Sequence, residues 1–163
     1  MDRLKRYQSW ILGFGGLGFL IVFVLVWRGL PSASSTKIMT TAVVQLGSIR
    51  VPVGVAATES ARYQGLSDRQ NLAADSGLLF VFKPAEKPVF VMRNMKFPLD
   101  IIWIAAGKII QINSQLPPEG SSPKNFYQTT EAVDYVLEVN AGFAARQKLA
   151  VGNKFFLNDT LRP

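Results

Sequence analysis

The sequence predicts a mainly β fold: a compact antiparallel β-sandwich or barrel-like domain with two or three short helices, preceded by one N-terminal transmembrane helix. Two observations predict the domain. Short runs rich in Val, Ile and Phe recur from residue 42 onward, and turn-forming Gly, Pro, Asn and Asp separate them. The membrane helix is predicted by a long uncharged apolar run near the N-terminus.

Residues 10–27 carry no charged side chain, and Trp10 and Trp27 stand at the two ends of this run. A helix of about 18 residues spans roughly 27 Å, close to the bilayer core of about 30 Å. A cleaved signal peptide is the alternative, but its apolar region is usually shorter and leads into a small-residue cleavage site. Arg28 ends the run instead, so we expect an uncleaved signal-anchor helix over residues 10–28.

The charges around this run predict its orientation. Residues 1–9 form a basic segment with Arg3, Lys5 and Arg6, which favours a cytoplasmic N-terminus. Residues 29–40 are rich in Ser and Thr and indicate a linker. We therefore expect a single-pass protein of the cell membrane whose all-β domain, residues 41–163, is extracytoplasmic.

Composition excludes several kinds of chemistry. The chain has no Cys and no His, which rules out thiol nucleophiles, disulfides and His-based general base catalysis. We expect no cofactor and no metal site. Lys and Arg number 18 against 11 Asp and Glu, a net charge of +7, but no basic cluster stands out within the domain. Nucleic acid is therefore not an expected partner.

The first part of the domain predicts two strands and a short helix. The strands cover residues 42–46 and 49–55; the second alternates with a valine at every other position, and Pro52 marks it as an edge strand or a bulge. Thr58 can cap a helix over residues 59–64, and Gly65 can end it. A second helical turn over residues 68–72 could start at Asp68.

The middle of the domain predicts an apolar strand over residues 77–82 and a proline turn over residues 83–88. A central hairpin is expected next, formed by residues 89–92 and 101–105, and residues 108–113 add a further strand. A long polar loop covers residues 114–130. A strand over 135–139, a helix over 141–149 and a strand over 154–157 complete the domain.

Four sequence blocks occur in an order that resembles a known family. They are ARYQGLSDR at residues 61–69, GLLFVF at 77–82, FVMRN at 90–94 with PLDI at 98–101, and YVLEVNAG at 135–142. Together they resemble the uncharacterised ancient-conserved-region family called domain of unknown function 192, over roughly residues 43–157. The resemblance implies a small all-β domain, often exported or membrane-anchored, and it implies no particular reaction.

Two arginines, Arg62 and Arg69, lie around the predicted short helix and its exit. A guanidinium pair is well shaped to hold a carboxylate or a phosphate. The structural alternative is that the two arginines pair with Asp100 and Glu138 and brace the sheet.

A second polar group, Arg93, Asn94 and Asp100, flanks the predicted central turn. It could line a shallow polar pocket at one end of the barrel. Alternatively, Asn94 and Asp100 could bond the backbone of their own turn.

Glu138 interrupts an otherwise apolar strand, where alternation places it on the same face as Val136. A carboxylate among apolar neighbours is expected to be either paired or functional. The resulting hypothesis is a membrane-anchored binding module for an anionic small molecule, a glycan or an envelope protein. Two alternatives remain open: a hydrolase that uses Asp100 and Glu138 as paired carboxylates, and a structural scaffold of the cell envelope. The binding hypothesis places six side chains on one patch: Arg62, Arg69, Arg93, Asn94, Asp100 and Glu138.

Overall fold

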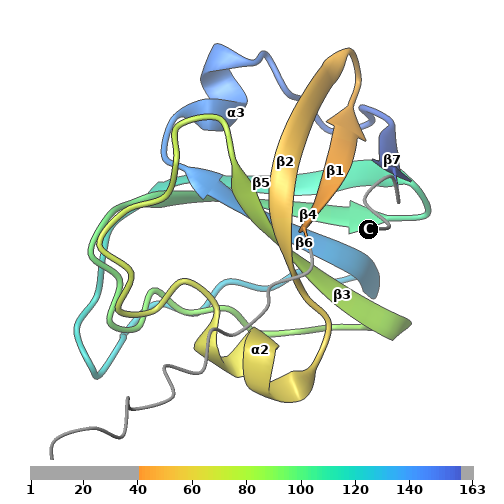
Figure 1. The fold of residues 1–163 in the computed structure, drawn as a ribbon. Helices are drawn as coiled ribbons and strands as arrows, with labels where there is room; N and C mark the ends of the chain where they lie inside the picture. Colours follow the sequence, from red (N-terminus) through yellow and green to blue (C-terminus); the bar gives the residue numbers. More distant parts are fainter. Residues whose placement is uncertain (1–40, 159–163) are drawn as a thin grey trace, which may run out of the picture. The chain divides into compact units, whose positions relative to one another are not determined.

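The computed structural model describes residues 41–158, which form seven strands and two short helices (Figure 1). The helices are α2 (Glu59–Gln64) and α3 (Phe143–Arg146). The predicted segments over residues 1–9, 10–28 and 29–40 lie outside this part of the chain. Within it, no helix is both long and apolar enough to cross a bilayer. The strands are β1 (Thr41–Leu46), β2 (Ile49–Ala56), β3 (Gly77–Glu86), β4 (Leu99–Ala105), β5 (Lys108–Leu116), β6 (Val133–Asn140) and β7 (Phe155–Asn158).

The seven strands form one sheet in the order β5-β4-β6-β3-β2-β1-β7. All neighbours are antiparallel except β2 and β3, which are parallel because the chain passes through α2 between them. The sheet curves into a half-barrel: Lys108 at the start of β5 forms an isolated bridge with Lys154, just before β7. The predicted mainly antiparallel β fold is therefore confirmed in its coarse form, as one curved sheet.

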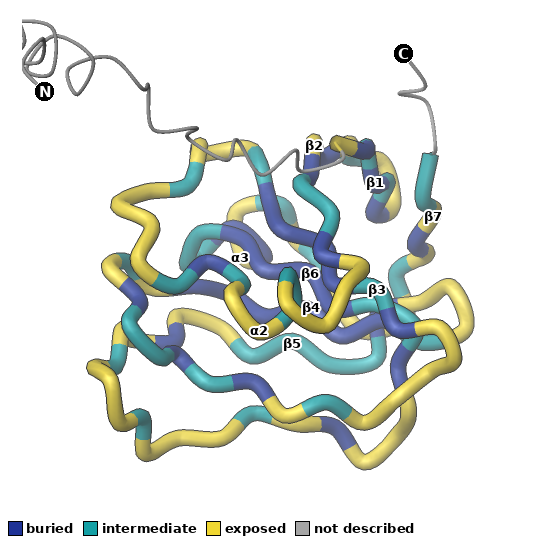
Figure 2. The backbone as a smooth tube through the Cα atoms, turned by 60° about the horizontal axis from the view of Figure 1, so that its bottom comes forward, coloured by how far each residue is buried: buried dark blue, intermediate teal, exposed yellow. Residues whose placement is uncertain are grey.

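Side chains alternate between the two faces of the sheet along each strand, and each face carries its own cluster of buried residues. Leu78, Ile101 and Trp103 lie in a cluster on one face together with Leu66, which follows α2. We call this the α2 face. The opposite face, which we call the α3 face, carries Leu79, Ile102, Ile104, Leu137 and Val139, which pack with Phe143 of α3. Figure 2 shows the buried central strands surrounded by exposed loops.

The predicted central hairpin is wrong, because β4 pairs with β5 and β6 and not with residues 89–92. Residues 87–98 instead cross the α2 face, where Phe90 and Tyr127 exchange two backbone hydrogen bonds of 2.8 and 2.9 Å. The strand that takes the place beside β4 is β6, about 30 residues further along the chain. A local pattern cannot reveal a partner at that distance.

Several predicted boundaries also shift. Strand β3 continues through the predicted proline turn to Glu86, and α3 covers only part of the predicted 141–149 helix, with Lys148 in the left-handed region at φ 55°. The turn over residues 68–72 is not helical, because Asp68 has φ 64° and a helix N-cap requires extended backbone. The capping prediction is confirmed: the Thr58 hydroxyl accepts the Ala61 N–H at 3.2 Å.

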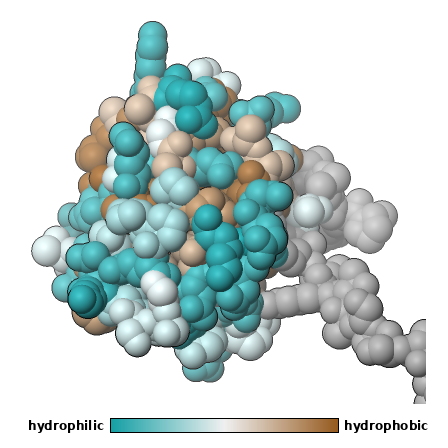
Figure 3. Space-filling model, turned by 90° about the vertical axis from the view of Figure 1, so that its left-hand side faces the viewer, coloured by the Kyte–Doolittle hydropathy of each residue, from teal (hydrophilic) through white to brown (hydrophobic). Residues whose placement is uncertain are grey.

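Three loops lie side by side on the left of Figure 1: residues 65–76, 87–98 and 117–132. Backbone contacts connect them, since Asp68 N–H donates to Asn94 O and Asn94 N–H donates to Gly120 O. The Glu119 carboxylate orders the third loop by accepting hydrogen bonds from Lys124 N and from the backbone and side chain of Asn125. Figure 3 shows this side of the molecule as largely hydrophilic with small apolar patches, so it presents no broad apolar docking face.

One glycine is required by the close approach of β3 to β6. A Cβ atom added to Gly77 would lie 2.8 Å from both the Glu138 carbonyl oxygen and Leu137 Cδ1. We expect Gly77→Ala to lower the free energy of unfolding by about 1–3 kcal/mol, since backbone must move to make room. Chemical denaturation measures this change. Gly120→Ala is the matched control, because nothing lies within 4 Å of its added Cβ; equal effects of the two substitutions would contradict the explanation.

Candidate functional site

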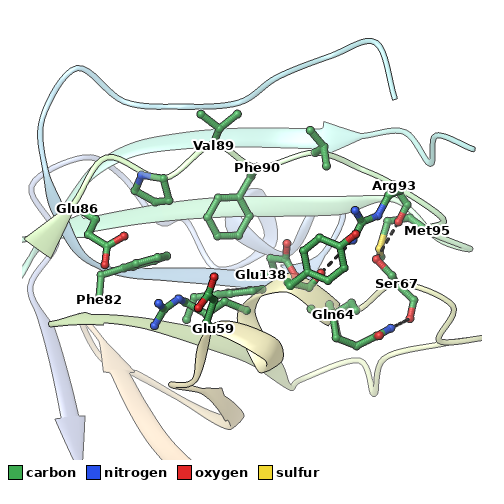
Figure 4. A pocket seen from close by; sticks show the side chains of 17 residues that line it. Glu59, Gln64, Ser67, Phe82, Glu86, Val89, Phe90, Arg93, Met95 and Glu138 are labelled. Atoms are coloured by element: carbon green, nitrogen blue, oxygen red, sulfur yellow. Dashed lines mark hydrogen bonds between the residues drawn. The ribbon is translucent and has the colours of Figure 1, made fainter. Parts of the chain in front are cut away.

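A pocket of about 590 Å³ opens between α2 and the segment that crosses the α2 face (Figure 4). Its apolar lining includes Phe80, Phe82 and Phe90, whose rings continue into the core: Phe80 and Phe90 meet edge-on at 4.8 Å, and Phe90 meets Trp103 at 5.3 Å. The volume lies within the range of small-molecule sites, about 300–1,000 Å³. The polar side chains that line the pocket are Glu59, Arg62, Gln64, Ser67, Glu86, Arg93 and Glu138.

Glu138 lines the pocket from β6, with Leu78 of β3 and Ile101 of β4 in register on either side. The residue is 5% exposed, and its Oε2 atom has no hydrogen-bond partner within the described residues. Burial without a compensating charge raises the pKa of this carboxyl from 4.5 to about 8. At neutral pH the group is therefore mostly a protonated acid that can donate one hydrogen bond.

Arg62 reaches the pocket from α2 and fixes the helix to the sheet. Its Nη1 donates to Ala57 O and Val81 O, both at 3.0 Å, and its guanidinium lies 5.1 Å from the Phe82 ring centroid. The alternative brace between Arg62 and Asp100 or Glu138 is not formed: Nη1 binds carbonyl oxygens, and among residues 41–158 no carboxylate lies within ion-pair distance of Arg62. The full positive charge of Arg62 thus remains at the pocket wall.

Arg93 brings a second positive charge to the same pocket. Its guanidinium lies 4.2 Å from the ring centroid of Tyr63, and its Nη2 donates to Tyr63 O at 3.0 Å. Ser67 holds the segment from the other side by donating its hydroxyl to Arg93 O at 2.9 Å. Among residues 41–158, Arg93 has no carboxylate partner within ion-pair distance, so its charge is available to a ligand.

Asp100 lies on the other face of the sheet. It is in register with Val139, whereas Glu138 is in register with Ile101, so the two carboxyl groups point to opposite sides. Asp100 is fully buried, and it accepts N–H groups from Gln115 at 2.8 Å, Gly142 at 3.0 Å and Ala144 at 2.9 Å. These bonds connect β4 to the end of β5 and to the start of α3. Asp100 therefore binds backbone from two other segments, and not only that of its own turn as the alternative predicted.

Arg69 and Asn94 also do not line the pocket. Arg69 is exposed beyond α2. Asn94 has φ 54°, a left-handed conformation that asparagine tolerates better than most residues, and its backbone bonds to Asp68 and Gly120. The structure therefore brings together three of the six predicted site residues, Arg62, Arg93 and Glu138, and leaves Arg69, Asn94 and Asp100 elsewhere.

The aromatic lining of the pocket and its two further acids, Glu59 and Glu86, are not among the six predicted site residues. Phe80, Phe82 and Phe90 are buried in the core cluster of the α2 face, and they also line the pocket. One sequence feature pointed to this part of the pocket: an aromatic residue, Tyr63, follows Arg62 on the predicted short helix. In the structure Tyr63 is 72% exposed, and α2 has no buried residue. Glu59 and Glu86 have no local motif that separates them from ordinary surface acids.

Three kinds of group define the chemistry of the pocket. One carboxylic acid is buried, two guanidinium groups carry positive charge, and aromatic rings supply apolar area. In the part of the chain that the structure describes, no group of three or more acidic side chains gathers in a way that could hold a metal ion. Paired-carboxylate hydrolysis needs two carboxyl groups facing one substrate, and Asp100 and Glu138 do not provide this pair.

The sequence profile of DUF192, described as an uncharacterized ACR, matches residues 42–157. The chain belongs to the DUF192 family. The predicted resemblance is thus confirmed, and the match covers the sheet, both helices and the pocket. The family description names no activity, so function has to be argued from the site.

Two solved structures resemble the DUF192 domain closely. A candidate transcription regulator from Sinorhizobium meliloti is 31% identical, with a TM-score of 0.68, over 73% of this chain and 95% of that one. A protein of unknown function from Novosphingobium aromaticivorans is 25% identical, with a TM-score of 0.67, over 79% of this chain and 94% of that one. No curated protein gives a significant match.

Proposed function

We propose that this DUF192 domain is a binding module whose pocket takes a small organic anion with an apolar body. The observation that carries the proposal is the joint placement of Arg62, Arg93 and Glu138 in one aromatic-lined pocket, where Glu138 Oε2 has no hydrogen-bond partner among residues 41–158. Guanidinium groups favour anions, and the rings of Phe82 and Phe90 offer apolar area to the remainder of the ligand.

Binding of a small anion is better supported than the other partners predicted from the sequence. A glycan would be favoured by several neutral hydrogen-bonding side chains around a flat platform, whereas this pocket combines charges with phenylalanine rings. An envelope protein would be favoured by a broad apolar patch, and the face seen in Figure 3 has only small ones. A purely structural scaffold would not explain a buried carboxyl that lacks a partner.

The test is a thermal-shift screen of the full-length chain in a mild detergent, because a ligand that binds only the folded state raises its stability. The probes are phenylpropionate, hexanoate, phenyl phosphate and a neutral oligosaccharide. We expect the organic anions to raise the midpoint and the oligosaccharide to leave it unchanged. Unchanged midpoints with every anion at millimolar concentration would rule out the proposal.

The role of Arg93 in this proposal gives a separate prediction. Arg93→Ala removes a half-buried guanidinium from the pocket wall, and we expect it to weaken binding of phenylpropionate by about tenfold at low salt. Titration calorimetry measures the affinity. Arg50→Ala is the control, because Arg50 is exposed on β2 and does not line the pocket. Equal losses in both variants would show that only the overall charge matters.

We also propose that the domain functions outside the cytoplasm, attached to the membrane through residues 10–28. The support is the sequence alone: an uncharged apolar run preceded by basic residues. A C-terminal alkaline phosphatase fusion, which is active only after export, should be active in cells. A C-terminal green fluorescent protein fusion is the complement, and strong fluorescence with no phosphatase activity would contradict this location.

A further inference from the structure

Glu138 is the most unusual group in the pocket, because it is buried and polar and yet has no partner at Oε2. A buried polar atom without a hydrogen bond costs about 1–3 kcal/mol, so such an atom calls for an explanation. Nothing in the sheet requires an acid at this position, since Leu78 and Ile101 flank it on the neighbouring strands. Figure 4 shows the side chain between Phe90 on one side and Glu59 and Gln64 of α2 on the other.

Four charged side chains line the pocket together with Glu138. On α2 these groups are Glu59 and Arg62, whose Nη1 binds two carbonyl oxygens. On the end of β3 and the segment after it they are Glu86 and Arg93, whose Nη2 binds Tyr63 O. Burial, and none of these four charges, is the cause of the raised pKa of Glu138.

We propose that Glu138 recognises the polar end of the ligand by donating its carboxyl proton to an acceptor oxygen, so that the pocket selects organic carboxylates and amides over amines. This inference rests on the proposed function and names the residue that recognises the polar end of the ligand. Burial keeps the acid protonated at neutral pH, with a pKa of about 8, which agrees with a donating role. An amine would instead require the carboxylate form.

The experiment compares three probes that share one apolar body: phenylpropionate, its primary amide, and phenylpropylamine. Affinities are measured by calorimetry on the full-length chain, on Glu138→Gln and on Glu138→Leu. Glutamine keeps a hydrogen-bond donor of similar shape, whereas leucine keeps only the volume and suits the neighbouring Leu78 and Ile101. We expect the acid and the amide to bind the wild type and Glu138→Gln within about threefold, and Glu138→Leu at least tenfold more weakly.

The pH dependence adds a readout that a merely structural role would not produce. The N,N-dimethyl amide of the same acid is neutral at every pH and has no N–H to donate to an ionised carboxylate, so its affinity should fall about tenfold for each pH unit above about 8 in the wild type. In Glu138→Gln the affinity should not change over the same range.

The outcomes separate this inference from the proposed function. Unchanged binding in Glu138→Leu together with loss in Arg93→Ala would overturn the inference and leave the anion pocket standing. Preferential binding of the amine, lost in Glu138→Gln, would overturn the inference and the choice of an anionic ligand together. Failure of all three probes to bind at millimolar concentration would overturn the proposed function and this inference with it.

Discussion

Replacing Asp100 by alanine should lower the free energy of unfolding by about 3–5 kcal/mol, because three backbone N–H groups, one buried and two partly buried, lose their acceptor at once. These donors come from Gln115, Gly142 and Ala144, so the loss affects both the end of β5 and the start of α3. Chemical denaturation of the full-length chain measures the change.

Two further substitutions make the Asp100 prediction specific. Asp100→Asn keeps one acceptor oxygen but turns an NH₂ group toward a backbone donor, so its cost should be smaller, about 1–3 kcal/mol. Asp75→Ala is the control, because Asp75 is an exposed acid, and it should change stability by less than about 0.5 kcal/mol. A loss below about 1 kcal/mol for Asp100→Ala would show that these three bonds do not hold the two segments in place.

The second large effect is the dependence of stability on pH that Glu138 imposes. Its pKa is about 8 in the folded chain against 4.5 for the free group, so between these values the folded state keeps a proton that the unfolded state has lost. The contribution of Glu138 to the free energy of unfolding is therefore largest below about pH 4.5, and it decreases as the pH rises toward 8. The total is on the order of 5 kcal/mol.

Glu138→Gln isolates this contribution, since the amide does not titrate. We expect the variant to gain stability relative to the wild type as the pH is raised from 5 to 8, and the difference to level off above about pH 8. Denaturation midpoints across this range measure the effect. Parallel stability curves for the two chains would mean that Glu138 does not change its protonation on folding.

Local patterns in the sequence predicted most of the elements but not their pairing. The strand over residues 49–55 and the capped helix over 59–64 follow from alternation and from Thr58 and Gly65, and both are confirmed. Pro52, predicted on an edge or a bulge, lies in the part of β2 before its pairing with β3 starts at Val53. The position of β6 between β3 and β4 depends on contacts far apart in sequence, and the local pattern contained no signal for it.

The candidate site was predictable to the extent that single residues reveal their surroundings. A lone acid in the apolar strand 135–139 indicated that Glu138 had to be paired or functional. Whether Asp100 lies on the same face of the sheet as Glu138 depends on the β4–β6 register, and a shift of one residue would put the two carboxyl groups on the same face. The α2 wall of the pocket is held in place by the hydrogen bond from the Arg62 guanidinium to Val81 O of β3. No spacing along the chain predicts this contact.

The measurement that tests this account most directly is a titration of the Glu138 side-chain carboxyl by carbon-13 NMR in the ligand-free, full-length chain, with Glu138→Gln used to assign the signal. If the pocket is built around a buried acid that carries its proton at neutral pH, the carboxyl carbon titrates with a midpoint near pH 8. A midpoint near the ordinary value of 4.5 would show a charged, solvated or paired carboxylate, and it would contradict both the role assigned to Glu138 and the pH dependence derived from it.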